Sequence, residues 1–283
     1  MVTPKVIVYK NPKDFWFEIS PHLKIEEAKN SLILGISFLF LSDPKNCIYQ
    51  SAFFDGSNFL GSLSCSQHRQ SMNLLPSPVN NSSHAKTLFD EFLKSNINLT
   101  GIVAETKKAE IYKSTIDSLG LKTRLNMSQG IYKCSKVLIP ATKDKINFRL
   151  ADIKDLKTIG EWIVDFHREA VPHDPPVNGE VEAKVRIGNE MIYVLEKENQ
   201  LLSMAAWSRD LKSSCSINLV FTPEKYRKKG YASLVTALLT QHMLLQGKKG
   251  TKLYTDTKNP TSNKIYQQIG YEFVCNSLHI GLV

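Results

Sequence analysis

The sequence predicts an α/β (α+β) protein, in which a mixed sheet flanked by helices follows a second, smaller or degenerate α/β domain. Short apolar runs alternate with segments of helical period from residue 148 onward. A polar stretch at residues 139–145 separates this part from an earlier part with a similar alternation. Because 283 residues suffice for two ordinary domains, we place them at 1–140 and 146–283.

In the first part, helical periods predict helices at residues 12–19, 26–41, 83–95 and 107–119. Apolar or alternating runs predict strands at 48–54, 59–64, 101–104 and 129–138. The most apolar run, Ser31–Leu41, is well short of the ~20 residues that span a bilayer, so we interpret it as a core helix. Residues 1–10 do not resemble a secretory signal, and we expect a cytoplasmic protein without a membrane segment.

In the second part, a strand at 148–150 precedes a helix at 153–168, a proline-containing loop at 173–179 and a helix at 180–188. Residues 191–196 and 201–208 are typical of a hairpin-like pair of strands. A buried strand at 216–221, a helix at 231–246 and a strand at 251–255 follow. A helix that begins after Asn259 and a strand at 271–276 complete the pattern.

A basic glycine turn lies between the buried strand and the helix that begins at Tyr231. Thr222-Pro223 ends the strand, because proline cannot donate to a strand ladder. Arg227, Lys228 and Lys229 then precede Gly230, which permits a backbone turn that a side chain would obstruct. The first N–H groups of a helix and its positive dipole end attract anions, so this turn predicts an anion-binding site.

The helix after residue 259 has a strong start signal and a tyrosine on a defined face. Asn259 is a good N-cap, and Pro260 occupies the favoured first helical position. Asn263 and Tyr266 follow at spacings of four and three residues, which place them near one face. We predict that this face lies beside the anion site and that Tyr266 donates a proton to a leaving group.

These residues resemble the GNAT superfamily of acetyl-CoA-dependent N-acetyltransferases. The R-x-x-G-x-A signature matches Arg227, Gly230 and Ala232, and the Asn-to-Tyr signature matches Asn259 and Tyr266, followed by Gly270-Tyr271. The resemblance extends from about residue 148 to the end. Three residues separate Pro223 from Arg227, where two are commoner, so the path of the turn departs from the usual pattern.

The resemblance implies an N-acetyltransferase, in the acyltransferase class EC 2.3.1, that moves an acetyl group from acetyl-CoA to a primary amine by direct attack. The pyrophosphate would rest on backbone N–H groups of the glycine turn, the pantetheine arm would pair with the preceding strand, and Tyr266 would protonate the departing thiolate. The cofactor-binding residues that it implies are Leu219, Val220, Phe221, Arg227, Lys228, Lys229, Gly230, Tyr231, Ala232, Ser233, Asn259 and Asn263.

The general base is not evident from the resemblance. Many relatives have a glutamate on the strand before the glycine turn, where this chain has Ser216 and Asn218. Other candidates lie in the segments 165–169 and 173–174; Glu169 is the first choice, and a water relay is equally compatible. The absent glutamate also motivates an alternative function, a catalytically silent acyl-CoA-binding sensor or scaffold.

The first part contains a faint copy of the second. Strand 100–104, Tyr112 and Gly120 parallel strand 251–255, Tyr266 and Gly270, and Glu105 stands where Asn259 would be. No R-x-x-G-x-A turn occurs there. Two interpretations stay open: a degenerate GNAT-like half that has lost its cofactor site, or a chance similarity.

Composition narrows the classes of partner. The formal charge of +9 suits an anionic cofactor, whereas spread lysines without a recognition motif argue against nucleic acid. Five cysteines without a C-x-x-C pair give no support for a metal site. The acceptor (small molecule or protein), the acyl chain length and the oligomeric state stay open.

Overall fold

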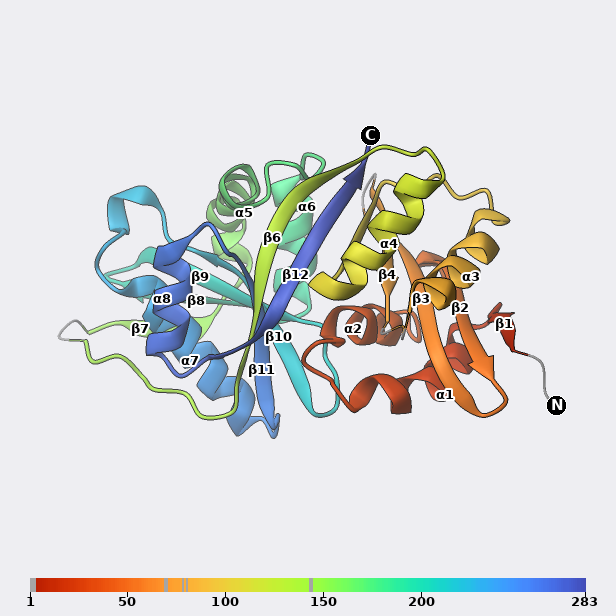
Figure 1. The fold of residues 1–283 in the computed structure, drawn as a ribbon. Helices are drawn as coiled ribbons and strands as arrows, with labels where there is room; N and C mark the ends of the chain where they lie inside the picture. Colours follow the sequence, from red (N-terminus) through yellow and green to blue (C-terminus); the bar gives the residue numbers. More distant parts are fainter. Residues whose placement is uncertain (1–3, 69–70, 78, 80, 143–144) are drawn as a thin grey trace. The chain divides into compact units, whose positions relative to one another are not determined.

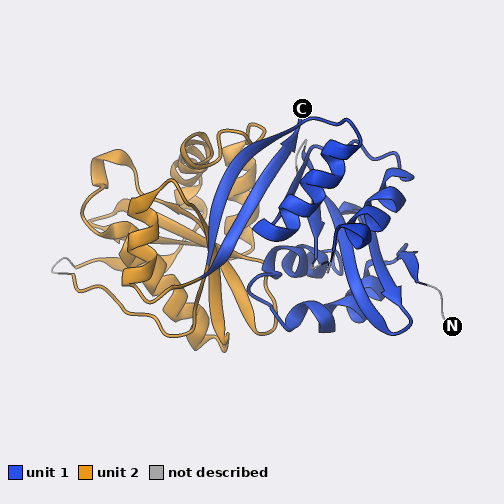
Figure 2. Ribbon diagram, viewed as in Figure 1, with its two compact units in different colours: residues 1–131, 274–283 blue, residues 132–273 orange. Residues whose placement is uncertain are grey.

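The computed structural model describes residues 4–68, 71–77, 79, 81–142 and 145–283. The chain forms two compact units (Figure 2): unit 1 comprises residues 1–131 and 274–283, and unit 2 comprises residues 132–273. The domain limits 1–140 and 146–283 stay a prediction, and residues 1–3 and 143–144 lie outside the described ranges.

Unit 1 contains four helices and the strands between them among its described residues (Figure 1). In chain order its elements are β1 (Lys5–Val8), α1 (Pro12–Lys24), α2 (Ser31–Leu39), β2 (Cys47–Asp55), β3 (Asn58–His68), β4 (Ser71–Pro76), α3 (Ser82–Leu93), β5 (Gly101–Glu105), α4 (Thr106–Ser118) and β6 (Thr123–Cys134).

Unit 2 repeats this organisation. The second series of elements is β7 (Asn147–Leu150), α5 (Leu156–Ala170), α6 (Gly179–Gly188), β8 (Ile192–Lys197), β9 (Gln200–Ser208), β10 (Ser214–Phe221), α7 (Tyr231–Leu245), β11 (Gly250–Asp256), α8 (Pro260–Gln268) and β12 (Glu272–Leu282), of which β12 belongs almost wholly to unit 1. Both series have the order strand, two helices, three strands, helix, strand, helix, strand. The internal similarity seen in the sequence is therefore a repeat of the fold.

The last strand of each series does not stay with its own series. In unit 1 the strand order is β1-β2-β3-β4-β5-β12-β6, so the C-terminal strand of the chain lies next to β5. The two strands are antiparallel, with Ile280 opposite Ile102 and Ser277 opposite Glu105. In unit 2 the order is β6-β11-β10-β9-β8-β7, and the end of β6 lies next to β11. Each unit thus needs a strand from the other series.

Two hydrophobic cores sandwich the sheet of unit 2. One core joins α7 and α8 to the sheet through residues such as Val235, Leu239 and Tyr266. The other joins α5 and α6 to the opposite face through Ile159, Trp162 and Ala183. The mixed sheet with helices on both faces is the fold class that the sequence predicts.

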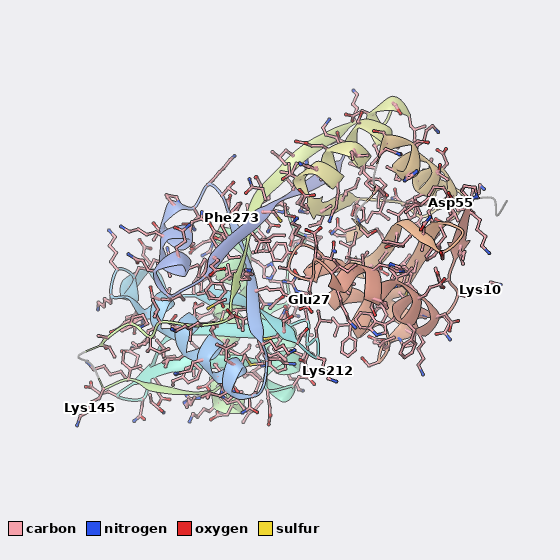
Figure 3. The ribbon with its side chains drawn as sticks, turned by 60° about the horizontal axis from the view of Figure 1, so that its bottom comes forward. Lys10, Glu27, Asp55, Lys145, Lys212 and Phe273 are labelled. Carbon is pink, nitrogen blue, oxygen red and sulfur yellow. The ribbon has the colours of Figure 1, made fainter. Side chains whose placement is uncertain are left out.

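Many charged residues of both units are exposed, whereas Lys108, Asp155 and Lys252 are buried. Figure 3 shows the side chains of Lys145 and Lys212 in unit 2 and of Lys10 and Asp55 in unit 1 directed away from the sheets, and all four are exposed. Within the described residues, no helix has the length and apolar character needed to cross a membrane.

The structure differs from the predicted elements mainly in unit 1. Strands β1 and β4 were not predicted, because β1 is only four residues long and β4 carries no β-branched residue. The helix predicted at 26–41 begins at Ser31, and α1 continues to Lys24 past Pro21. Strand β12 extends to Leu282 because it pairs with β5, a partner more than 170 residues away that no local pattern reveals.

The place of β12 in unit 1 yields a stability prediction. Ile280 is 1% exposed. Ile280→Ala should lower the free energy of unfolding by about 2–5 kcal/mol, because it leaves a cavity against β5. Asn276→Ala, on an exposed position of the same strand, should change it by less than about 0.5 kcal/mol. Urea denaturation followed by circular dichroism measures both, and equal stability of the two variants would contradict this placement of β12.

Candidate active site at the end of strand β10

A β-bulge interrupts β10 shortly before it ends. Asn218 lies opposite Ala206 and Phe221 opposite Met204, so three steps along β10 match two along β9. The extra residue of β10 is accommodated at Leu219. Its backbone φ of +46° is rare for a residue with a side chain of that size. The bulge is a local distortion that the neighbouring strands hold in place.

The bulge reverses the alternation of side chains along β10, so that odd-numbered residues face different helices before and after it. Before it, Cys215 and Ile217 belong to the core beneath α7 and α8. After it, Leu219 and Phe221 belong to the core beneath α5 and α6. Because Asn218 is paired with Ala206, which also lies in the α5–α6 core, its side chain faces the α5–α6 side.

β10 and β11 are paired over only part of their length. Their parallel pairs run from Ser214–Gly250 to Ser216–Lys252, whereas β10 continues to Phe221 and β11 to Asp256. The backbone of residues 219–221 therefore lies on a strand edge beyond the last of these pairs. Such an edge can pair with an extended ligand that carries amide groups.

The predicted anion loop follows this edge. A short turn at Glu224–Tyr226 leads to Lys228 and Gly230, whose φ angles are +63° and +81°. Gly230 is the N-cap of α7, and no side chain caps the helix at that end. Successive N–H groups in such a turn form a concave anion-binding surface at the positive end of the helix dipole.

A cavity of about 470 Å³ lies beside this loop. Its walls are Lys229–Tyr231, Ser233 and Leu234 on one side, Gln268 and Ile269 at the end of α8, and residues 138–142. The sequence pattern predicts a strand end and a polar linker at residues 138–142 and gives no sign of this contribution. The backbone N–H of Leu138 donates to the carbonyl of Ile269 at 3.0 Å and fixes the segment there.

Arg227, expected to bind the cofactor, and Glu169, expected to be the base, form an ion pair with each other. Arg227 Nη2 lies 2.6 Å from Glu169 Oε2, and both side chains are partly exposed. Arg227 Nε also donates to the carbonyl oxygen of Thr222 at 2.9 Å, and the guanidinium lies over the ring of Phe221. The ion pair connects the anion loop to α5 and occupies the carboxylate that the sequence suggested as a base.

Tyr266 lies on the buried side of α8. Asn259 caps this helix by accepting from Ser262 N at 3.0 Å, as its sequence signal predicts. Asn263 Nδ2 donates to the carbonyl oxygens of Asp256 and Asn259, while Asn263 Oδ1 is buried without a partner among the described residues. Tyr266 is 9% exposed, and burial raises its pKa to about 12. Its phenol is therefore protonated at physiological pH.

Tyr271 supports Tyr266 from the side. The two rings meet edge to face, with centroids 6.1 Å apart. The hydroxyl of Tyr271 is bonded to those of Thr240 on α7 and Thr251 on β11, each at 2.7 Å. In contrast, the described residues offer no hydrogen-bond partner to the hydroxyl of Tyr266, so that group is not committed to holding the fold together.

The equivalent positions of unit 1 lack these features. β4 pairs with β3 without a shift of register from Leu63–Pro76 to Gln67–Met72. The helix that corresponds to α7 is α3, and its N-terminus is capped by Asn81, which accepts from His84 N at 2.9 Å. Tyr112, which corresponds to Tyr266, is fully buried, and its hydroxyl has no partner in the described part of the chain. Unit 1 keeps the fold without the open loop.

Comparisons with known proteins agree with this architecture. Residues 194–280 match the family model of FR47-like proteins. No curated protein sequence matches this chain.

Solved structures cover almost the whole chain. An X-ray structure of a Drosophila protein matches with a TM-score of 0.68 and 11% identity over 98% of each chain. A GCN5-related N-acetyltransferase from Sphaerobacter thermophilus matches with a TM-score of 0.64 and 11% identity, over 98% of this chain and 95% of that one. A tandem GNAT protein of the clavulanic acid biosynthesis pathway matches with a TM-score of 0.61 and 7% identity, over 99% and 98%. The chain therefore has the fold of the GCN5-related N-acetyltransferases, present twice.

Proposed function

We propose that unit 2 transfers an acetyl group from acetyl-CoA to a primary amine by direct attack. The observation that carries the proposal is the open N-terminus of α7, preceded by two left-handed residues and directly following the bulged end of β10. This arrangement offers N–H donors to a pyrophosphate within reach of a strand edge for the pantetheine arm. Acetyl-CoA supplies the activated acyl group.

The residues of the loop and of α8 fit this co-substrate. Backbone N–H groups of residues 228–233 would bind the pyrophosphate, with Lys228 and Lys229 adding positive charge. The edge at residues 219–221 would pair with the pantetheine amides. The partnerless Asn263 Oδ1 would accept from one of their N–H groups or from the hydroxyl, which explains why it is left open. Asn259 would hold the start of α8 in place.

Tyr266 would act as the general acid. A neutral amine nitrogen attacks the thioester carbonyl carbon, the C–N bond forms and the C–S bond breaks. The departing sulfur would take the proton of the Tyr266 hydroxyl, and solvent would then reprotonate the phenolate. A raised pKa supports this role because the phenol keeps its proton until the thiolate forms.

The base assignment favours a relay through water. Glu169, the first choice from sequence, forms an ion pair with Arg227, so its carboxylate is directed at that guanidinium rather than at an acceptor amine. The proposal includes the acyltransferase class, a primary amine as acceptor and a cytoplasmic location. A silent acyl-CoA sensor is the alternative that the experiments below distinguish.

Gly230→Glu should abolish acetyl-CoA binding. The substitution puts a negative charge and a side chain at the centre of the anion loop, where a Cβ meets nothing within 4 Å. Gly247→Glu is the matched control, because Gly247 ends the same helix with a φ of +93° and the same open space. Both variants carry about 1–2 kcal/mol of backbone strain, so only the electrostatic effect differs.

Isothermal titration calorimetry with acetyl-CoA and with free CoA measures the effect. The control should bind like the wild type. Equal binding by all three proteins would exclude this loop as the phosphate site.

Tyr266→Phe should keep acetyl-CoA affinity and lower turnover by about 10²- to 10⁴-fold, the range for a positioned acid. Its stability should be nearly unchanged, because no hydrogen bond of the described residues is lost. Tyr271→Phe is the structural control: it leaves Thr240 and Thr251 without their partner and should lower stability by about 1–3 kcal/mol with a smaller effect on turnover.

Single-turnover rates with acetyl-CoA and a panel of amines, together with thermal unfolding, separate the two effects. Full turnover by Tyr266→Phe would remove this residue from the mechanism. Binding without turnover by the wild-type protein would identify a sensor.

A further inference from the structure

Asn218 directly precedes the segment 219–221, which in the proposed function would pair with the pantetheine arm. It is the last residue paired with β9 before the bulge, and its side chain lies on the α5–α6 side of the sheet. Asn218 Nδ2 donates to Ser208 Oγ at 2.6 Å, which fixes the orientation of the amide. A bulge aims a side chain in this way next to many active sites.

The amide oxygen of Asn218 is unusual because it is buried and bonded to nothing in the described part of the chain. Leaving such an acceptor without a donor costs about 1–3 kcal/mol. The nitrogen of the same amide already donates a hydrogen bond, so the amide is held in one orientation and its oxygen can still accept one. A ligand that supplies an N–H or O–H donor would remove this cost.

The surroundings of Asn218 disfavour a cation. Lys252 Nζ donates to Ser214 Oγ at 2.7 Å, which places Lys252 on the same sheet face as Ser214 and, by alternation, Asn218. Tyr254 follows two residues later on that face, and the guanidinium of Arg209 lies over its ring at 5.0 Å. Lys252 and Arg209 give this face of the sheet positive charge, which disfavours an ammonium group there.

Several acidic groups of the elements packed on this face have basic partners, whereas Glu161 on α5 and Glu180 on α6 are exposed, and α5 also carries His167. Glu169 is paired with Arg227, and Asp165 is paired with Arg168, both on or against α5. On α6, Glu182 is paired with Arg186, and in the loop between the helices Asp174 lies 3.6 Å from His173. The strand residues themselves (Ser208, Ser216 and Asn218) carry no group that can take up a proton near neutral pH.

We propose that Asn218 Oδ1 accepts a hydrogen bond from the acceptor amine, and that unit 2 therefore acts on weakly basic amines that arrive neutral, such as α-amino groups and aryl amines. The inference rests on the proposed acetyl transfer and specifies its substrate class. An amide oxygen orients the N–H bond but cannot remove a proton from an ammonium ion. The amine must lose that proton to solvent before it binds.

The step balances without a protein base. The neutral amine forms the C–N bond, the C–S bond breaks, and the sulfur takes its proton from Tyr266. The proton that the new amide nitrogen releases passes to water, and water returns one to Tyr266. Strongly basic amines such as a lysine side chain, with a pKa of about 10.4, are neutral in only about one molecule in 10³ at pH 7. They should be correspondingly poor substrates.

The test compares pH profiles of kcat/KM for the full chain with amines of different basicity: aniline, glycinamide and benzylamine, each at saturating acetyl-CoA. For the wild type, kcat/KM should rise tenfold per pH unit up to the pKa of each amine and level off there. Asn218→Leu, which has a similar size, should lower kcat/KM by about tenfold for every amine with unchanged acetyl-CoA affinity. Asn218→Asp should add a base and raise benzylamine transfer at pH 6 by about tenfold or more.

Asn276→Asp makes the same chemical change on an exposed position of β12 and should behave like the wild type. Profiles that level off at one common pH for all amines would reveal a protein base, such as His173 or Asp174, and overturn the inference while leaving acetyl transfer intact. Wild-type rates in Asn218→Leu would also overturn it. Acetyl-CoA binding without transfer to any amine would refute the proposed function, and the inference with it.

Discussion

The bulge at Leu219 is the constraint on which the rest of unit 2 depends. One extra residue in β10 reverses the alternation of the strand, so that residues on either side of it pack into opposite cores. The left-handed backbone of Leu219 is unfavourable by itself and persists because Leu219 and Phe221 are buried beneath α5. As a result, β10 presents a strand edge beyond its last pairs with β11, and the side chain of Asn218 has a fixed orientation.

The two units share a fold but differ at the positions that form the candidate site. Both have the same order of elements, and both have a tyrosine at the same place on the helix before their last strand. In unit 1 the register of β4 is regular, and the side chain of Asn81 caps the N-terminus of α3. In unit 2 the corresponding strand is bulged, and Gly230 leaves the end of α7 open. A few backbone and cap differences thus decide which copy has an open helix N-terminus.

The exchange of the last strands has a consequence for how the protein is divided. β12 follows α8 in the chain but completes unit 1, where Ile280 lies opposite Ile102. The ten C-terminal residues are therefore part of the core of unit 1. A fragment that ends at Phe273 lacks them and leaves β5 without its antiparallel partner β12.

Polar groups rather than carboxylates distinguish the acceptor side of unit 2. The serines of β9 and β10, Asn218 and the basic side chains Lys252 and Arg209 form a face that suits a neutral donor. Glu169, the acidic group that sequence reasoning favoured, lies against Arg227 instead. In the proposed reaction, the proton balance would rely on water and on the basicity of the acceptor.

The sequence by itself determined those features that depend on neighbours along the chain. Gly230 at a helix start, the Asn259 cap and the seven-residue step to Tyr266 follow from local backbone geometry, and the structure places each where its pattern indicates. Only the tertiary structure decided the pairing of β12 with β5, the Arg227–Glu169 contact, the part of residues 138–142 in the cavity wall and the orphaned oxygen of Asn218. These arise between segments far apart in sequence, where packing and strand register select the partners and no periodicity records them.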